Sequence, residues 1–333
     1  MLEATREQGD ALCGGFVSWR TLASLDGLGL PVARLGGHPV NRVRLFAGDN
    51  YAEARLPSPA IGISRRRLDA FLTAEALAAG AGLDRGVAAA ALEQDGALLL
   101  KDGTRLQPES LFIATGKHEL RGLGRARFDA PTLGLRVKLP AHPALSRMID
   151  DAIELHLFEG GYAGLLLQED GSANLCMAVR KTDFADAGGS PAQFLLTLAA
   201  ACPALGERLA FMGPSPDIDA IASIPYGWIG QDTRPGQFRL GDQAACIPSL
   251  AGEGNGLALA SGIRAAAAWE RGGALASVDY QRRFARSARV PVGVAKLLWH
   301  AAESPPLASL LTSAARIAPA LTRLAASLTR IRH

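Results

Sequence analysis

The motifs that mark self-contained hydrolases and metalloenzymes are missing from this sequence. It has no HExxH, no GxSxG and no Walker A loop, and its six histidines never pair at metal-ligand spacing. Its four cysteines form no CxxC pair, so the common zinc sites and a secreted disulfide framework are not indicated. We therefore expect no metal site and four reduced, mostly buried thiols.

Charge and long apolar runs are also scarce. The net charge is only +3, which is too small for a surface that tracks nucleic-acid phosphates. No run of eighteen apolar residues could span a membrane, and the N-terminus lacks the apolar run of a signal peptide. The expectation is a cytoplasmic protein that binds no nucleic acid. Disorder is excluded because 48% of the 333 residues are hydrophobic.

The first third of the chain predicts helices between irregular segments and short strands. Apolar residues at helical spacing follow Ser18 and Ser64, and Ser64 can act as an N-cap. Residues 36–59, rich in glycine and proline, are expected to be irregular. Residues 86–114 carry two Asp-Gly hairpin signals, and their last apolar run, 111–114, predicts a fully buried strand.

The character of the sequence changes near residue 133. Four short apolar strands separated by glycine turns predict an antiparallel sheet, followed by a helix over 191–201 and a long Pro-rich loop to Pro225. A strand at 237–240 then leads through a glycine-rich turn into an Ala-rich helix. The remaining tail is predicted to be helical, with interruptions at its prolines. The four predicted strands lie at 133–139, 153–158, 162–167 and 174–179.

The glycine-rich turn after the strand at 237–240 is the most informative segment. Its glycines let backbone N–H groups approach an anionic ligand, and the N-terminus of the following helix adds a partial positive charge. Asp242, at the end of the strand, can accept hydrogen bonds from ribose hydroxyls. A turn that binds no ligand is the alternative. The spacing is GxGxG, not the GxGxxG of a first Rossmann turn. The candidate residues are Gly241, Asp242, Pro248, Gly252, Gly254 and Asn255.

With four further segments in matching order, this turn resembles the second flavin motif of FAD-dependent oxidoreductases of the geranylgeranyl reductase and aromatic hydroxylase superfamily. The resemblance covers about residues 1–275. The other matching segments are Leu2-Glu3 with Cys13-Gly14-Gly15, the helix starting Ser64-Arg65, the segment Phe112 to Gly122, and Phe158 to Asn174.

The resemblance implies roles for several of these residues. Glu3 would bind the adenosine ribose, Arg65 the adenosine or diphosphate part, and Asp242 the ribityl or diphosphate region of FAD. The helix beginning at Gly254-Asn255 would point its N-terminus at the flavin, where it stabilises the negative charge of the reduced ring. Thr115-Gly116 replaces the family's usual Asp-Gly at a cofactor contact, which leaves NAD(P)H open as an electron donor.

The family's GxGxxG unit precedes its ribose-binding acid by about 20 residues. The matching acid here is residue 3, so that unit would lie upstream of Met1. Three explanations remain open: a start assigned too late, a shortened protein with weak or no flavin binding, and a different family.

The expected fold class is α/β, with an N-terminally incomplete Rossmann-like FAD-binding domain, an antiparallel β-sheet substrate domain and C-terminal helices. The predicted divisions are 1–130 and 226–275 for the FAD-binding domain, 131–225 for the substrate domain and 276–333 for the helices.

The expected function is FAD-dependent oxidation or reduction of an apolar or aromatic-lipid substrate, by alkene reduction or aromatic hydroxylation. The alternatives are a non-catalytic remnant of this fold without flavin and a binding protein for small hydrophobic molecules. Core packing is the competing interpretation for each candidate substrate contact. These contacts are Cys13, His156, Tyr162, Tyr226 and Trp228.

The C-terminal segment 304–333 combines leucines with Arg316, Arg323 and Arg330, spaced seven residues apart. This pattern fits a helix lying peripherally on an anionic membrane at its inner face. It also fits an amphipathic helix packed on the body of the protein, which is the favoured reading. The arginine run 65–67 is interpreted as a solvated helix start.

Overall fold

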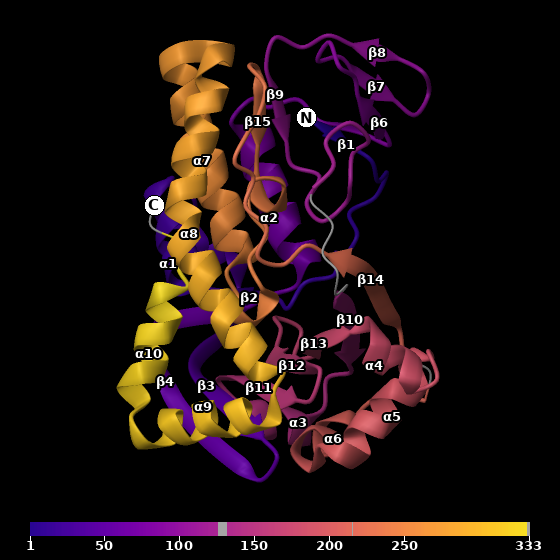
Figure 1. The fold of residues 1–333 in the computed structure, drawn as a ribbon, viewed down its shortest axis with the longest axis vertical. Helices are drawn as coiled ribbons and strands as arrows, with labels where there is room; N and C mark the ends of the chain where they lie inside the picture. The colour runs from indigo at the N-terminus through magenta and orange to yellow at the C-terminus, as the bar shows by residue number, and fades with distance from the viewer. Residues whose placement is uncertain (126–131, 215, 332–333) are drawn as a thin grey trace.

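The computed structural model describes residues 1–125, 132–214 and 216–331. Its largest sheet has eight strands in the order β14-β10-β13-β12-β11-β3-β4-β2 (Figure 1). All neighbouring strands are antiparallel except β3 and β11, which are parallel. The strands are β2 (Phe16–Val17), β3 (His38–Ala47), β4 (Asn50–Gly62), β10 (Thr132–Leu139), β11 (Ala152–Phe158), β12 (Gly161–Leu167), β13 (Ala173–Arg180) and β14 (Ile218–Ile224).

The four strands predicted after residue 133 are confirmed as β10 to β13. The expectation that 36–59 is irregular is wrong, because this stretch forms β3 and most of β4. Its prolines misled the prediction. Pro57 and Pro59 lie where the ladder between β3 and β4 shifts register, between the paired residues Arg55 and Ala60. Proline is tolerated at such a bulge because no ladder hydrogen bond is required of it.

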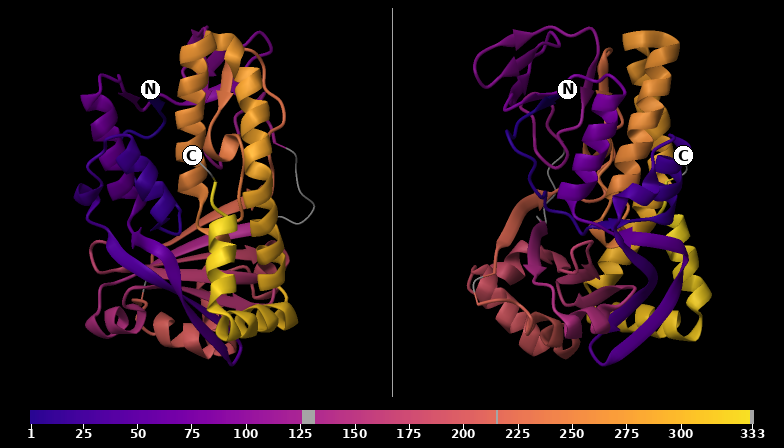
Figure 2. Two further views of the ribbon diagram at one scale, coloured as in Figure 1. Left: turned by 90° about the vertical axis from the view of Figure 1, so that its left-hand side faces the viewer. Right: turned by 180° about the vertical axis from the view of Figure 1, so that it is seen from behind.

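Side chains alternate between the two faces of this sheet. One face is an apolar core that includes Leu135, Leu165 and Leu175, and it is covered by α3 (Pro143–Ile149), α4 (Lys181–Asp186), α5 (Pro191–Ala201) and α6 (Pro203–Leu209). The other face points toward the rest of the molecule. Figure 2 (left) shows the sheet between helices α3 to α6 and the half of the molecule that contains the longer C-terminal helices. The predicted helix 191–201 is confirmed, but the Pro-rich loop is wrong in part, since α6 and β14 lie within it.

The other half of the molecule contains two separate parallel strand pairs, β1 (Leu2–Glu3) with β5 (Asp84–Arg85) and β9 (Leu111–Ile113) with β15 (Gln237–Arg239). Three further strands form the predicted hairpins: β6 (Ala89–Leu92), β7 (Leu98–Leu100) and β8 (Arg105–Leu106). The prediction of a fully buried strand at 111–114 is corrected, because Phe112 is exposed and stacks on Phe238 of β15. The divisions at residues 130, 225 and 275 stay a prediction, although β2 to β4 join the large sheet.

Two helices of this half begin at serine caps, of which Ser64 is the predicted one. The hydroxyl of Ser18 accepts from Thr21 N at the start of α1 (Trp19–Gly27), and that of Ser64 accepts from Arg67 N at the start of α2 (Arg65–Ala78). The C-terminal helices are α7 (Gly254–Gly272), α8 (Ser277–Ala302), α9 (Pro305–Ile317) and α10 (Pro319–Leu328), with short 3₁₀ turns η1 (Val32–Leu35), η2 (Gly241–Gln243), η3 (Ser249–Ala251) and η4 (Gly273–Ala276). Pro305 and Pro319 start helices, whereas α8 continues through Pro291. Among the described residues, none of these helices is long and apolar enough to cross a membrane.

Candidate functional site

The loops that follow β9 and β15 lie at one edge, because parallel neighbouring strands end on the same side. Two buried side chains tie these loops together. Gln243 donates from Nε2 to the carbonyls of Gly116 and His118 at 2.9 Å each. Arg125 donates to the carbonyls of Gly116 (3.2 Å) and Asp242 (3.0 Å). The hydroxyl of Thr115 donates to His118 O within the first loop. Thr115-Gly116 and Gly241-Asp242 are thus brought to one place.

A group of charged side chains and thiols surrounds Asp242. Burial raises the pKa of its carboxyl, while Lys117, Arg125 and Arg65 oppose that rise. Burial alone would lower the pKa of Lys117, but the charge of Asp242 and electrostatic interactions with Cys13, Cys176 and Cys246 raise it. Within the described residues no side chain is hydrogen-bonded to the Asp242 carboxylate. It is a carboxylate among cations that remains available to an outside hydroxyl.

Arg65 and Cys13 adjoin this group from α2 and from the loop before β2. Arg65 is held by Asp69 through Nε and Nη2, both at 2.9 Å, and its pKa is raised by the neighbouring Cys13 and Asp69 against the effect of burial. The loop at Cys13 is fixed to the sheet, because Asn174 Nδ2 donates to Cys13 O at 2.9 Å. A Cβ on Gly15 would come within 3.0 Å of Ile63 O, so this loop lies close to its neighbour.

The N-terminus of α7 opens beside the same edge. Gly254 is exposed, a Cβ there would meet nothing within 4 Å, and no side chain caps this helix. The first N–H groups of a helix have no partner within it, and the helix dipole makes that end positive. The turn before it is tight. Gly252 has φ +62°, and a Cβ there would lie 2.9 Å from Phe16, so only glycine fits. Asn255 lies in the first turn, and Pro248 is buried just before η3.

Glu253, just before α7, is buried and anchors the C-terminus. Its carboxylate accepts from Ser18 at 3.0 Å and lies 3.3 Å from Nη1 of the buried Arg330. Arg330 also donates to Ala251 O and lies over the ring of Trp19, 4.9 Å from its centroid. The segment after α10 therefore holds the turn that precedes α7.

Two buried phenols meet a single serine below this turn. Tyr162 of β12 and Tyr226 both hydrogen-bond to Ser249 Oγ, the latter at 2.6 Å. Burial raises the pKa values of both phenols well above the usual 10, so each stays protonated. Tyr162 and Tyr226 thus meet at Ser249, and their role as substrate contacts stays a prediction.

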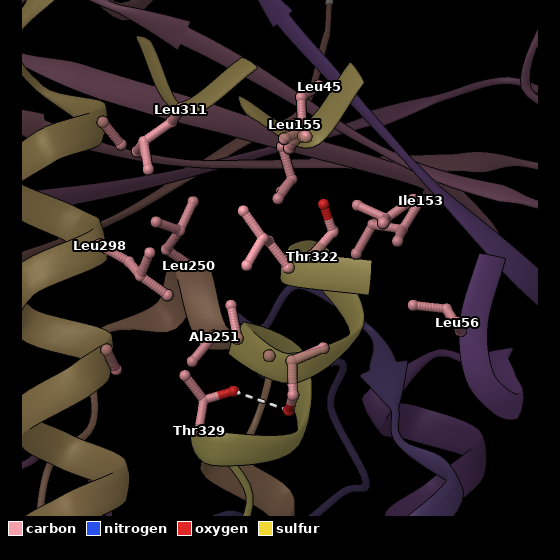
Figure 3. Close-up of a pocket in the computed structure, with 18 of the residues that line it drawn as sticks. Leu45, Leu56, Ile153, Leu155, Leu250, Ala251, Leu298, Leu311, Thr322 and Thr329 are labelled. Atoms are coloured by element: carbon pink, nitrogen blue, oxygen red, sulfur yellow. Dashed lines mark hydrogen bonds between the residues drawn. The ribbon is translucent and has the colours of Figure 1, made fainter. Parts of the chain in front are cut away.

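An apolar pocket of about 290 Å³ lies beside this cluster. Figure 3 shows strand residues Leu45, Ile153 and Leu155 on one side, with Leu298 and Leu311 of α8 and α9 facing them. The turn residues Leu250, Ala251 and Gly252 form another wall. Only Thr322, Thr329 and Arg330 contribute polar side chains to its lining. The pocket thus shares a wall with the turn that leads into α7.

The structure does not bring His156 to this site, which corrects the expectation that it lines the substrate cavity. His156 faces the opposite side of the sheet, where it stacks on Phe46 at 4.5 Å between centroids and contacts Glu154 at 3.3 Å. Strand alternation explains the difference, because its neighbours Leu155 and Leu157 line the pocket instead.

Two other predicted residues, Glu3 and Trp228, are not among those that line the pocket. The carboxylate of Glu3 accepts from the backbone N–H and the hydroxyl of Thr5, both at 2.8 Å, at the end of β1. Trp228 lies beneath Arg125 and Arg239, whose guanidinium carbons are 6.0 and 5.9 Å from its ring centroid. Trp228 therefore supports the arginine that ties the two loops.

Among the described residues, no group of three or more His, Cys, Asp or Glu side chains could hold a metal ion. No protein-family model matches the chain, and no curated protein matches its sequence. Solved structures do match its fold. PqsL of P. aeruginosa, in complex with 2-aminobenzoylacetate, is 16% identical with a TM-score of 0.71, over 94% of this chain and 92% of that one.

Two further structures match over nearly the whole chain. A flavoprotein/dehydrogenase from Cytophaga hutchinsonii has a TM-score of 0.76 at 14% identity, over 98% of this chain and 85% of that one. HpxO of Klebsiella pneumoniae, complexed with FAD and uric acid, has a TM-score of 0.74 at 17% identity, over 98% and 89%. The chain has a flavoprotein fold. The predicted α/β fold class, with its sheet and C-terminal helices, is confirmed by these matches.

Sequence reasoning missed four residues that build this site of the flavoprotein fold: Lys117, Arg125, Ser249 and Glu253. Lys117 directly follows Thr115-Gly116, so the sequence itself placed a positively charged residue next to a candidate cofactor-binding turn. Arg125 contacts Asp242, which lies 117 residues away in the sequence. Glu253 contacts Arg330, which lies nearly eighty residues away. No local sequence pattern marks such contacts.

Proposed function

We propose that this protein is an FAD-dependent oxidoreductase whose apolar substrate occupies the pocket beside the turn that precedes α7. The carrying observation is that the available carboxylate of Asp242 and the uncapped N-terminus of α7 flank the turn whose residues Leu250 to Gly252 also line the apolar pocket. A flavin cofactor fits the first two features, because its ribityl hydroxyls can donate to Asp242 and its ring can carry negative charge near the α7 N-terminus. An apolar substrate fits the pocket. The solved structures of the same fold include complexes with FAD.

The residues present fit the flavin and ribityl parts of FAD. Asp242 would accept from ribityl hydroxyls, and the α7 N-terminus at Gly254-Asn255 would face the pyrimidine edge of the ring. Glu3 and Arg65 would contact the adenosine or diphosphate part. When bound, FAD supplies the redox chemistry, while the protein's residues orient the ring and exclude water. Thr115, Gly116, Gly241, Pro248 and Gly252 would shape the backbone around it.

The pocket defines the proposed substrate. Its lining is almost entirely aliphatic, so a neutral aliphatic or aromatic molecule is favoured over a charged one. Cys13, Tyr162, Tyr226 and Trp228 stay candidate substrate contacts, although they are not among the residues that line this pocket. PqsL and HpxO were solved with 2-aminobenzoylacetate and uric acid, which are small ring compounds. We propose oxygenation or reduction of a small apolar molecule, with NAD(P)H as the electron donor.

The direct test is titration of the purified chain with FAD. We expect saturable quenching of flavin fluorescence and an induced circular dichroism signal in the flavin bands. NADPH should then bleach the visible absorbance of the bound flavin. A chain that gives neither flavin signal at any FAD concentration would contradict the proposal and leave the non-catalytic remnant.

A binding protein without redox activity is the second candidate, because the lining of the pocket is almost entirely apolar. A bulky substitution in the pocket lining tests whether small apolar molecules bind in the pocket. Replacing Ala326 by Phe puts a ring into the lining, so we expect at least about tenfold weaker binding of the neutral fluorescent probe N-phenyl-1-naphthylamine. The control is Ala320→Phe on the exposed side of the same helix. Equal probe binding by both variants would place the probe elsewhere.

A further inference from the structure

Helices α9 and α10 have two unlike sides. Their inner sides pack on the sheet and line the pocket, with Ala308, Thr312 and Ala315 buried. The favoured reading of this segment, an amphipathic helix packed on the body, is therefore confirmed. Their outer sides carry large apolar side chains without cover, and Leu310 and Ile317 are 64% and 81% exposed. We call the exposed set the α9–α10 surface; it consists of Leu307, Leu310, Ile317, Leu321, Leu324 and Leu328.

The charged side chains of this C-terminal segment have one sign. Residues 304–333 contain no aspartate or glutamate. Arg316 and Arg323 are exposed, and within the described residues neither has an ion-pair partner. A second copy of the chain docked on the same surface would bring arginine toward arginine, which is unfavourable. A negatively charged partner with an apolar interior complements both features.

We propose that the α9–α10 surface docks on an anionic lipid bilayer, with the leucines among the acyl chains and the arginines at the phosphates. Leucines on one side of a helix with arginines beside them are the features by which helices lie in the interface of anionic membranes. Each arginine near such a surface adds attraction to anionic lipid. Both helices lie at the end of the molecule away from β6 to β8, where α10 continues from the end of α9 at a steep angle (Figure 1).

This docking would place the pocket next to lipid. Leu311, Ala314 and Ala325 line the pocket from the same two helices that carry the surface. An apolar molecule could pass from the bilayer into the pocket without crossing water. This last step rests on the proposed function, whereas docking itself requires no flavin.

Vesicle flotation of the full chain tests the docking. We expect the protein to float with vesicles of phosphatidylglycerol and phosphatidylcholine in equal parts, and far less with phosphatidylcholine alone. The double variant Leu310→Glu/Ile317→Glu should lose about tenfold or more in vesicle affinity, because two apolar anchors become anionic. Leu196→Glu/Leu275→Glu, which changes two leucines that are 60% and 78% exposed elsewhere, should float like the unchanged chain.

A charge test separates lipid docking from general stickiness. Arg316→Gln/Arg323→Gln should lower affinity for the anionic vesicles about tenfold, while Arg282→Gln/Arg286→Gln, with the same charge change on α8, should have little effect. Failure of the unchanged chain to float, or equal flotation of the leucine variants, would overturn the proposal. A dimer in size-exclusion chromatography that Leu310→Glu/Ile317→Glu dissolves, without vesicle binding, would assign the surface to a second copy instead. Because flotation uses no flavin, its failure leaves the proposed function standing.

Discussion

Replacing Asp242 by alanine is expected to weaken FAD binding by about 10- to 100-fold, the range for losing hydrogen bonds to a charged group. The carboxylate has no hydrogen-bonded side-chain partner among the described residues, so its removal breaks no side-chain hydrogen bond. It does remove the negative charge that faces Lys117, Arg125 and Arg65, in addition to the proposed contact to ribityl hydroxyls. The measurement is titration of fluorescence quenching with FAD, fitted to a Kd for both proteins.

The matched control is Asp232→Ala, which removes an exposed aspartate from the loop before β15. It changes the net charge by the same amount, so the general electrostatic attraction of the anionic FAD rises equally in both variants. We expect the Kd of the control to stay within about twofold, since a lone surface charge contributes little. If Asp242→Ala binds FAD as tightly as the control does, Asp242 is not a cofactor ligand.

Asp242 also shows why part of the site was predictable from sequence. A strand that ends in Gly-Asp, followed by a glycine-rich turn and a helix, is a local pattern, and its parts stay adjacent in the fold. The cap at Ser64 and the strands after residue 133 were predictable for the same reason. In each case neighbours in sequence decide the local structure.

The features that the sequence did not reveal depend on contacts over long separations. Arg125 acts on Asp242, and Arg330 acts on Glu253, through bonds that no spacing encodes. The strand β4 was hidden because its prolines lie at a register shift, which only the partner strand defines. The orientation of His156 followed from its strand's register, and a shift of one residue would have reversed it.

The observed orientation places His156 beside Glu154 in a buried ionic cluster. Removing Glu154 is the second substitution for which we expect a large effect. Glu154, which is fully buried, accepts from Arg208 Nε at 2.9 Å and Nη2 at 3.1 Å. It also accepts from Arg44 at 3.3 Å. Glu154→Ala leaves two largely buried guanidinium groups without this partner. We expect the free energy of unfolding to fall by about 3–5 kcal/mol, as measured by urea denaturation.

Glu207→Ala is the control, because Glu207 pairs with the same Arg208 at 2.8 Å but is 66% exposed. Its removal should cost less than about 1 kcal/mol, as is typical of exposed ion pairs. Equal losses in the two variants would show that burial does not determine the strength of this cluster.

The same cluster gives a pH dependence with a definite sign. Burial alone would raise the pKa of Glu154, but hydrogen bonds from His156 and Arg208 lower it from the usual 4.5 to about 2. Because the folded-state pKa is depressed, the stabilisation by Glu154 is fully present above pH 4.5 and is lost as the pH falls toward 2. The difference in unfolding free energy between the unchanged chain and Glu154→Ala should therefore be constant near neutrality and shrink below pH 4.5. A difference that stays constant down to the acid-unfolding region would mean that the carboxylate charge contributes nothing, and that the loss in Glu154→Ala is one of packing.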